Sequence, residues 1–311
     1  MNTDFQKSIE EELIRFKEEQ QFLPGKNARK KWQYFDISDN LFPPIKHSFL
    51  QFAYDNAVPL HDYVTHVRSS QIFGINLLYP LLIDRDKGHG ALLNIFNRIV
   101  NEQFTSITEF EFEYSPDKDL LGEWPGDTKP SEYITAVDIT IKFENKNREK
   151  FMFFNEIKFT EDEFSPCNGI TSSGCTFENR KNCENFRNVI DDNTKCYLHK
   201  KVRRRSARKY FEYFDFQNEL LLEQKECPFI NNNQCMRNHA LARAMKSDEK
   251  FKGTYFGLIY HDKNNDIEEE WKKYNNLFRD QSELFSIKAS EIVREYENNI
   301  YKLYFEKRYG L

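Results

Sequence analysis

Two neighbouring apolar segments in the middle of the chain constrain its fold most strongly. Residues 133–143 and 151–159 are rich in β-branched and aromatic side chains, and the polar turn Asn145-Lys146-Asn147 separates them. Such runs, bounded by turn residues, are typical of strands, and a short polar connection predicts an antiparallel hairpin. Just upstream, residues 109–114 alternate strictly between glutamate and aromatic residues, which predicts a third strand.

Helical patterns lie on both sides of these strands. Apolar residues at helical spacing predict an amphipathic helix over 5–16, and an apolar run predicts a buried helix over 69–82. We also expect helices over 92–100, 206–223, 234–245 and 289–304, and one more strand over 254–260. This order fits the α/β class, with an αβββαβ core in which helices flank a mixed sheet. We assign the core to residues 61–262, with helical extensions over 1–60 and 263–311, all packed as one unit.

Composition limits the class of protein. Phe (29) and Tyr (16) are numerous enough to fill a core, which excludes a disordered chain. A net charge of −5 argues against a general polyanion binder, although an enzyme can confine its positive charge to one groove. No apolar run reaches the roughly 20 residues that span a bilayer, and residues 1–4 lack the features of a signal peptide. We therefore expect a cytoplasmic protein without a membrane partner.

The sharpest chemical pattern is Glu156-Ile157-Lys158 on the second hairpin strand. Residues i and i+2 of a strand point to the same side, so Glu156 and Lys158 project together. Asp138 lies on the preceding strand, and pairing of the two strands would bring both carboxylates to one cation. Carboxylates are ligands that Mg²⁺ prefers, and the Ile157 carbonyl could add another oxygen. A nearby lysine can stabilise the charge that develops during phosphodiester cleavage.

This pattern also has a simpler interpretation. Most Glu-x-Lys pairs on strands are solvated surface residues. Here, however, Glu156 and Lys158 sit in a strongly apolar strand, and the preceding apolar strand carries the isolated Asp138. Charges in such positions are costly unless they bind something or face a cleft, which favours a functional site.

With these residues in view, the chain resembles the PD-(D/E)XK nuclease superfamily. Asp138 followed across a hairpin by Glu156-Ile157-Lys158 matches its catalytic pattern, although Ala136-Val137 stands where the naming proline would be. Residues 69–82 and 234–242 resemble two helices of a bacterial PD-(D/E)XK nuclease-like (restriction endonuclease-like) family, and Cys227-Pro228 also fits. The resemblance covers about residues 60 to 262.

The resemblance implies a restriction-endonuclease-like core and Mg²⁺- or Mn²⁺-dependent cleavage of DNA, in restriction or phage defence. By similarity to RecB-type nucleases, Gln234 would approach the active site. Arg237 and Asn238 would then contact substrate, or else brace their helix. Gln71 and Asn76 have two possible roles. They either act at the substrate or support the fold through buried hydrogen bonds.

The strongest basic run surrounds Arg203, Arg204 and Arg205. It either binds DNA phosphates or forms a solvated face, and the sequence leaves both interpretations open. DNA is the expected partner, and a homodimer is compatible with the pattern. The alternative function is a catalytically inactive nucleic-acid-binding or protein-interaction module on the same fold.

All six cysteines follow the hairpin. They are Cys167, Cys175, Cys183, Cys196, Cys227 and Cys235. Zinc motifs usually contain a closely spaced cysteine pair, which is lacking here, so we expect free or structural thiols. An iron–sulfur cluster or zinc at these cysteines is the alternative.

Overall fold

A mixed sheet forms the centre of the molecule in the computed structural model. The structure describes residues 4–22, 30–100, 102–124, 134–200, 207–215, 219–248 and 250–311. The strands are β1 (Phe104–Tyr114), β2 (Val137–Asn145), β3 (Lys150–Lys158), β4 (Gly253–Tyr260) and β5 (Leu284–Lys288). They lie side by side in chain order. The predicted hairpin is confirmed, because β2 pairs antiparallel with β3 and Ile141 stands opposite Phe153.

The sheet changes direction at β3. β1, β2 and β3 pair antiparallel, whereas β4 pairs parallel with β3 and β5 pairs parallel with β4. Parallel neighbours need a crossover connection, and the chain between Lys158 and Gly253 supplies it with helical segments on one side of the sheet. The mixed sheet flanked by helices confirms the predicted α/β class.

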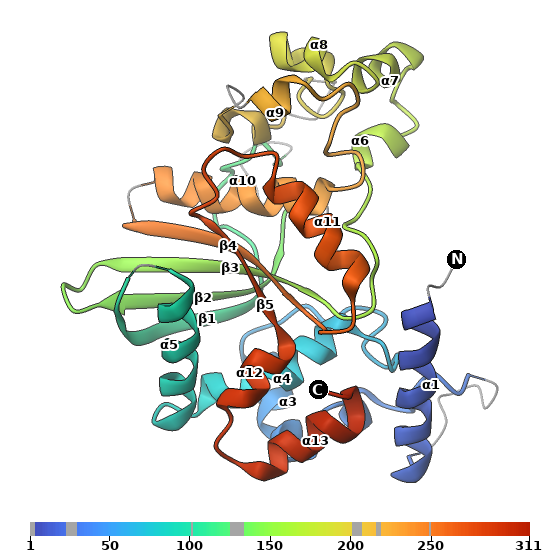
Figure 1. The fold of residues 1–311 in the computed structure, drawn as a ribbon, viewed down its shortest axis with the longest axis vertical. Coiled ribbons are helices and arrows are strands. Elements are labelled where there is room, and N and C mark those ends of the chain that lie inside the picture. Colours follow the sequence, from blue (N-terminus) through green and yellow to red (C-terminus); the bar gives the residue numbers. More distant parts are fainter. Residues whose placement is uncertain are drawn as a thin grey trace.

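Helices cover both faces of the sheet (Figure 1). Before β1 lie α1 (Asp4–Glu19), α2 (Ile37–Asn40), η1 (Pro43–Ile45), α3 (Lys46–Asp55), α4 (Ser70–Ile83) and α5 (Lys87–Ile99). Between β3 and β4 lie α6 (Asn168–Thr171), α7 (Phe177–Cys183), α8 (Phe186–Asp191), η2 (Asn193–Lys195), η3 (Tyr210–Tyr213), α9 (Glu219–Leu222) and α10 (Asn233–Ser247). The remaining helices are α11 (Asn265–Asn275), α12 (Ala289–Glu295) and α13 (Asn299–Tyr309).

The continuous apolar character of β3 follows from this covering. Phe151 and Phe153 join the core on the side of α4 and α5, whereas Met152 and Phe154 join the core on the side of α10 and α11. A strand that is buried on both faces needs apolar residues at every position, not at alternate ones. The polar residues near its end therefore stand out as exceptions.

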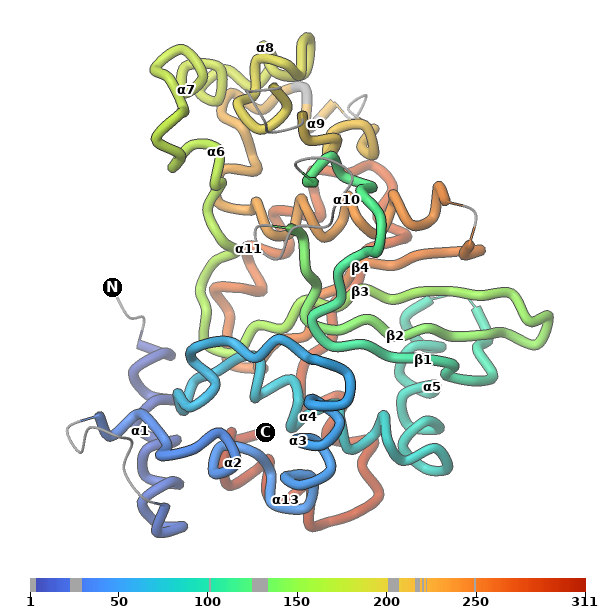
Figure 2. The backbone as a smooth tube through the Cα atoms, turned by 180° about the vertical axis from the view of Figure 1, so that it is seen from behind, coloured from blue at the N-terminus to red at the C-terminus, as the bar shows by residue number. Residues whose placement is uncertain are grey.

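The two ends of the chain meet on one side of the molecule. In Figures 1 and 2, α1 lies beside α13, and both lie below the level of α10. Gln6 of α1 donates a hydrogen bond of 2.8 Å from Nε2 to the Thr160 carbonyl, directly after β3. The N-terminal helix therefore reaches the end of the strand that carries Glu156 and Lys158.

Two predicted helices are wrong in part. Within 206–223, the described residues form only the short η3 and α9. Tyr210, Phe211 and Phe214 pack instead into a small helical lobe, which is formed by the described residues between Cys167 and Cys227. The helix predicted over 289–304 is two helices, which break where Tyr296 turns extended and the Asn298 side chain caps α13.

One strand, β5, was not predicted from the sequence. This five-residue strand lies inside the extension that was predicted to be wholly helical, and it pairs with β4. Its pattern is too short to signal a strand, since only Phe285 and Ile287 alternate into the core. The segment becomes a strand because it pairs with β4 at the edge of the sheet.

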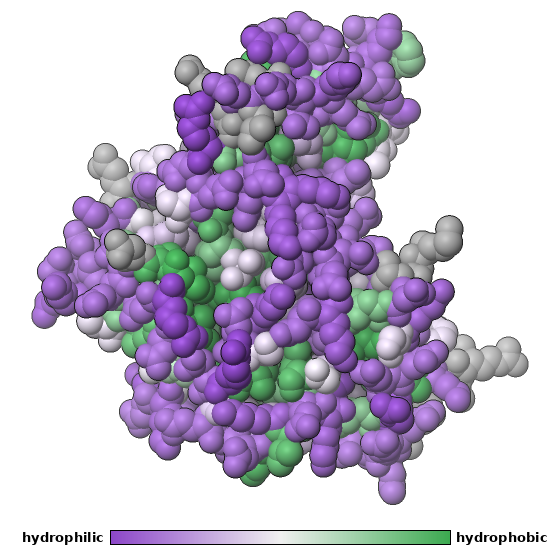
Figure 3. Space-filling model, viewed as in Figure 1, coloured by the Kyte–Doolittle hydropathy of each residue, from purple (hydrophilic) through white to green (hydrophobic). Residues whose placement is uncertain are grey.

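Apolar side chains are concentrated around the sheet. Figure 3 shows them in the middle of this face, between more hydrophilic regions formed by the surrounding helices. Among the described residues, no helix is both long enough and apolar enough to cross a membrane.

Candidate active site

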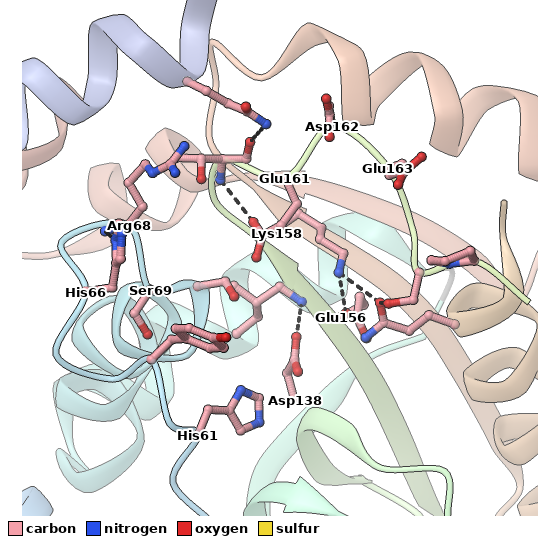
Figure 4. A pocket seen from close by; sticks show the side chains of 18 residues that line it. His61, His66, Arg68, Ser69, Asp138, Glu156, Lys158, Glu161, Asp162 and Glu163 are labelled. Atoms are coloured by element: carbon pink, nitrogen blue, oxygen red, sulfur yellow. Dashed lines mark hydrogen bonds and ion pairs between the residues drawn. The ribbon is translucent and has the colours of Figure 1, made fainter. Parts of the chain in front are cut away.

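The predicted catalytic residues meet where β2 begins and β3 ends. Because the two strands are antiparallel, the start of one lies beside the end of the other. A cleft of about 670 Å³ opens there. Its lining includes Asp138, Glu156, Ile157, Lys158 and Gln234, together with Gln6, His61, Tyr63, His66, Arg68, Ser69, Ser70, Thr160, Glu161, Asp162, Glu163, Ser165 and Pro166 (Figure 4).

Asp138 is tied directly to the neighbouring strand. Its Oδ2 accepts a hydrogen bond of 2.6 Å from the backbone N–H of Ile157. Loss of solvent raises the pKa of Asp138 well above its usual range, and the nearby charges of Glu156 and Glu113 raise it further. The ammonium of Lys158 opposes this shift without reversing it.

Glu156 is almost completely enclosed, with 1% of its surface exposed. Its Oε2 accepts a hydrogen bond of 2.8 Å from Nδ2 of Asn238, on α10. Its Oε1 lies 3.0 Å from Nζ of Lys158. Burial raises the pKa of Glu156, although Lys158 acts in the opposite direction.

Lys158 remains a cation in this environment. Burial alone would lower its pKa, but Glu156, Glu161 and Asp138 together raise that pKa above the usual lysine value. Its Nζ also donates a hydrogen bond of 2.9 Å to Oε1 of Gln234. A lysine held in the ammonium form can stabilise negative charge but cannot accept a proton from water.

The donor set fits a hard divalent cation. Asp138 and Glu156 are carboxylates whose pKa values are raised, chiefly because burial removes them from solvent, and a bound cation would offset the cost of ionising them. Oxygen ligands of this kind suit Mg²⁺ or Mn²⁺, which complete their coordination with main-chain oxygen and water. Among the described residues, no group of three or more His, Cys, Asp or Glu side chains is arranged to hold a metal ion. A cation here would thus depend on two side chains.

The helix residues expected near the site have different surroundings. Gln234 lines the cleft and binds Lys158, whereas Asn238 lies behind Glu156 and holds that carboxylate. Arg237 turns to another cluster: its Nε donates to Oγ1 of Thr135 over 3.1 Å and lies 3.6 Å from Glu123. Arg237 is not among the described residues that line the cleft.

Gln71 and Asn76 are both buried in hydrogen-bond networks. Gln71 accepts a hydrogen bond of 3.0 Å from the backbone N–H of His61 and donates one of 2.7 Å to Glu113. Asn76 accepts from the backbone N–H of Phe42 over 2.8 Å and donates to the Tyr309 hydroxyl over 2.9 Å. Asn76 therefore ties α4 to the segment at Phe42 and to α13, while Gln71 braces one wall of the cleft.

Arg203, Arg204 and Arg205 lie outside the described residues. The cysteines form no disulfide among the described residues, and five of the six belong to the stretch from Cys167 to Cys227 that builds the small lobe. Within this lobe, the backbone N–H of Cys227 donates to the carbonyl of Cys183 over 2.7 Å.

Several residues at the site were not predicted from the sequence. Gln6 and Arg68 line the cleft from before the core helices, and His61 and Glu113 form an ion pair beside Asp138. Glu113 could have been noticed, because it is the last glutamate of the strict alternation over 109–114. Nothing in the local sequence singles out His61, since only the folded chain brings it to the strands.

Together, the sheet order and the site define a restriction-endonuclease-like α/β protein. A model of the family described as "Restriction Endonuclease associating with ARP" matches residues 14–310. The chain belongs to this family, and the match includes most of both extensions as well as the core. Membership indicates a nuclease-like function. The comparisons with curated proteins and with solved structures found no match.

Proposed function

We propose that this protein is a Mg²⁺- or Mn²⁺-dependent endonuclease that hydrolyses phosphodiester bonds of DNA. The observation that carries the proposal is the meeting of Asp138, Glu156 and Lys158 in the lining of one cleft, where both carboxylates are largely shielded from solvent. Membership in a restriction endonuclease family supports DNA as the substrate.

Asp138 and Glu156 would hold the cation, together with the carbonyl oxygen of Ile157. When bound, a divalent cation lowers the pKa of a water molecule and offsets charge on the phosphate. The hydrogen bond from the Ile157 N–H fixes Oδ2 of Asp138, and the Asn238 amide fixes Oε2 of Glu156. These two contacts hold the carboxylates in place before substrate arrives, which avoids reorganisation during the reaction.

Lys158 would contact a nonbridging oxygen of the scissile phosphate. Its raised pKa keeps the ammonium charged, so its role is charge stabilisation and the orientation of water. Gln234 restrains the ammonium from the α10 side through its 2.9 Å hydrogen bond. An interaction that strengthens as charge develops on the phosphate raises the rate of the chemical step.

Further substrate contacts are proposed around this centre. Gln234 lines the cleft, where it would contact the DNA backbone. Gln71 would contribute indirectly, because it holds the backbone of His61 in the cleft wall. The run of Arg203, Arg204 and Arg205, which lies outside the described residues, would bind DNA phosphates. Restriction or phage defence is the biological role that the family suggests.

Cleavage assays test this proposal. Supercoiled plasmid, linear duplex, single-stranded DNA and RNA would be incubated with the full chain in Mg²⁺, in Mn²⁺ and in EDTA. We expect DNA cleavage that requires a divalent cation and is lost in Asp138→Asn and Glu156→Gln. Glu109→Gln is the matched control, because Glu109 is an exposed strand glutamate paired with Lys142.

The variants separate the alternatives. Circular dichroism would show whether Asp138→Asn and Glu156→Gln keep the native fold. If the wild-type protein binds DNA but shows no cleavage with either cation, the chain is an inactive binding module. If Asp138→Asn cuts as fast as wild type, the assigned centre is wrong.

A further inference from the structure

His61 and Glu113 form an ion pair at the edge of the reaction centre. The imidazole Nε2 lies 3.3 Å from Oε1 of Glu113. Glu113 stands between the strand pairs Phe112–Ile139 and Tyr114–Val137, so it faces Asp138 across the β1–β2 ladder. In Figure 4, Asp138 lies between the His61 ring and Glu156. Glu113 on β1, Asp138 on β2 and Glu156 on β3 therefore lie between His61 and Lys158.

Gln71 fixes both members of the pair. Its Nε2 donates to Oε1 of Glu113 over 2.7 Å, and its Oε1 accepts from the His61 backbone N–H over 3.0 Å. Its Nε2 also donates to the Pro59 carbonyl over 2.9 Å, which anchors the loop that carries His61. One buried amide thereby sets the position of the loop and of the carboxylate.

The backbone at Glu113 is strained. Its φ of 53° lies in the left-handed region, which is uncommon for a residue other than glycine. Such strain persists only where the surrounding structure enforces it, and it often occurs at functional sites. Here the strained position directs a carboxylate toward His61, so the observation is consistent with a positioning role.

The two side chains differ in exposure. The Glu113 side chain is 8% exposed, whereas that of His61 is 51% exposed and lines the cleft. The carboxylate is therefore buried behind the imidazole. With Nε2 turned to Glu113, Nδ1–H is the donor left for an anion in the cleft.

The charges around His61 favour its cationic form. The hydrogen bond to Glu113 raises the pKa of His61, burial acts against it, and the charges of Glu113, Glu156 and Asp62 raise it further. Asp138 on β2 and Lys158 on β3 are the other charged strand residues in this part of the cleft. A neutral imidazole becomes a cation by binding one proton, so His61 can supply positive charge on the Asp138 side of the centre.

We propose that His61 is a fourth residue of the reaction centre, which contacts the scissile phosphate from the Asp138 side while Lys158 contacts it from the Glu156 side. Glu113 and Gln71 are positioning residues that act through His61. This inference rests on the proposed nuclease function and adds a second phosphate-binding cation from outside the two catalytic strands.

Four variants test it: His61→Gln, Glu113→Gln, Asp138→Asn and the control His47→Gln, which changes an exposed histidine on α3. Glutamine at position 61 can still bond to Glu113 but cannot carry charge. Single-turnover cleavage of a labelled DNA duplex with saturating Mg²⁺ reports the chemical step. Titration calorimetry with Mg²⁺ alone reports cation binding.

We expect His61→Gln to slow cleavage by roughly 10²-fold, the cost of removing one charge-stabilising donor, with unchanged Mg²⁺ affinity. Because the pKa of His61 is raised, its contribution is present at low pH and is lost as pH rises through that pKa. Glu113→Gln removes the main cause of the shift, so its rate should decline at lower pH than that of wild type. This profile tests the inference even if His61→Gln fails to fold.

Other results would overturn the inference. Normal cleavage by His61→Gln, beside an inactive Asp138→Asn, rejects the role of His61 and leaves the nuclease function standing. Normal cleavage by both variants rejects the nuclease centre itself. Loss of Mg²⁺ affinity in His61→Gln, equal to that in Asp138→Asn, would make His61 a cation ligand and not a phosphate contact. An unchanged pH profile in Glu113→Gln would show that Glu113 does not act through His61.

Discussion

Lys158 and Gln234 are joined by a hydrogen bond of 2.9 Å, although 76 positions separate them in the chain. The bond connects the last residue of β3 to the first turn of α10. Lys158 also pairs with Glu156 at 3.0 Å, so its ammonium is held from two directions. A cation held in this way keeps its position when substrate binds.

Replacement of Gln234 should disturb the position of Lys158 and not its charge. In Gln234→Ala the ammonium keeps its ion pair with Glu156 but loses its restraint from α10. We expect single-turnover cleavage to fall by roughly tenfold, which corresponds to about 1.4 kcal/mol of transition-state stabilisation. Mg²⁺ affinity should remain unchanged in calorimetry. The control is Gln51→Ala, which changes a surface glutamine on α3. Equal cleavage rates for the two variants would show that Gln234 does not position Lys158.

Lys158 itself should matter for turnover more than for cation binding. Lys158→Ala should still bind Mg²⁺, because a cation does not ligate a cation, yet it should lose most single-turnover activity. Lys158→Arg should rescue poorly, since the planar guanidinium is larger than the ammonium that Glu156 and Gln234 enclose. Normal cleavage by Lys158→Ala would contradict the Glu-x-Lys assignment.

The raised pKa of Asp138 predicts a pH-dependent stability difference. A carboxyl group with a folded-state pKa above its unfolded value stabilises the protein at low pH, and this contribution is lost as pH rises through the folded pKa. In EDTA, Asp138→Asn should therefore match the unfolding free energy of wild type at acid pH and exceed it at neutral pH. Mg²⁺ should stabilise wild type and leave the variant unchanged. Denaturant titrations at two pH values, with and without Mg²⁺, measure both effects.

Arg237 should contribute to stability because of its contacts with Thr135 and Glu123. Glu123 is buried and also accepts hydrogen bonds from the Thr135 N–H over 2.6 Å and from the Tyr210 hydroxyl over 2.7 Å. Arg237→Gln should lower the free energy of unfolding by roughly 1–3 kcal/mol. The salt dependence of DNA binding should stay the same. A smaller salt slope with unchanged stability would instead identify Arg237 as a phosphate contact.

The basic run should determine how strongly salt weakens DNA binding. Neutralising Arg203, Arg204 and Arg205 to Gln should weaken affinity and reduce the log–log salt slope by about one for each phosphate that is no longer neutralised. Fluorescence anisotropy in the Asp138→Asn background avoids cleavage during the measurement. The matched control removes the same number of charges at Lys272, Lys273 and Arg279, which are exposed. The same reduction in both triple variants would mean that the run acts only through net charge.

Much of the architecture could be predicted from the sequence because its signals are local. The hairpin of β2 and β3 follows from two apolar runs and one polar turn. The helical spacing of residues 5–16 predicted α1, and the long apolar run over 69–82 predicted α4. Glu156 and Lys158 share a face by the two-residue period of a strand. The grouping of Asp138 with Glu156 and Lys158 could also be predicted, since the two strands that carry these residues are consecutive in the chain.

Tertiary structure decided the remaining features, because they depend on contacts between distant segments. β5 is a strand through its pairing with β4, and the helix predicted over 206–223 gives way to packing in the small lobe. His61 and Glu113 meet only when the loop before α4 folds against β1, and Asn238 meets Glu156 only when α10 packs on the sheet. Local periodicity shows which side of an element a residue occupies. The fold alone determines what faces it.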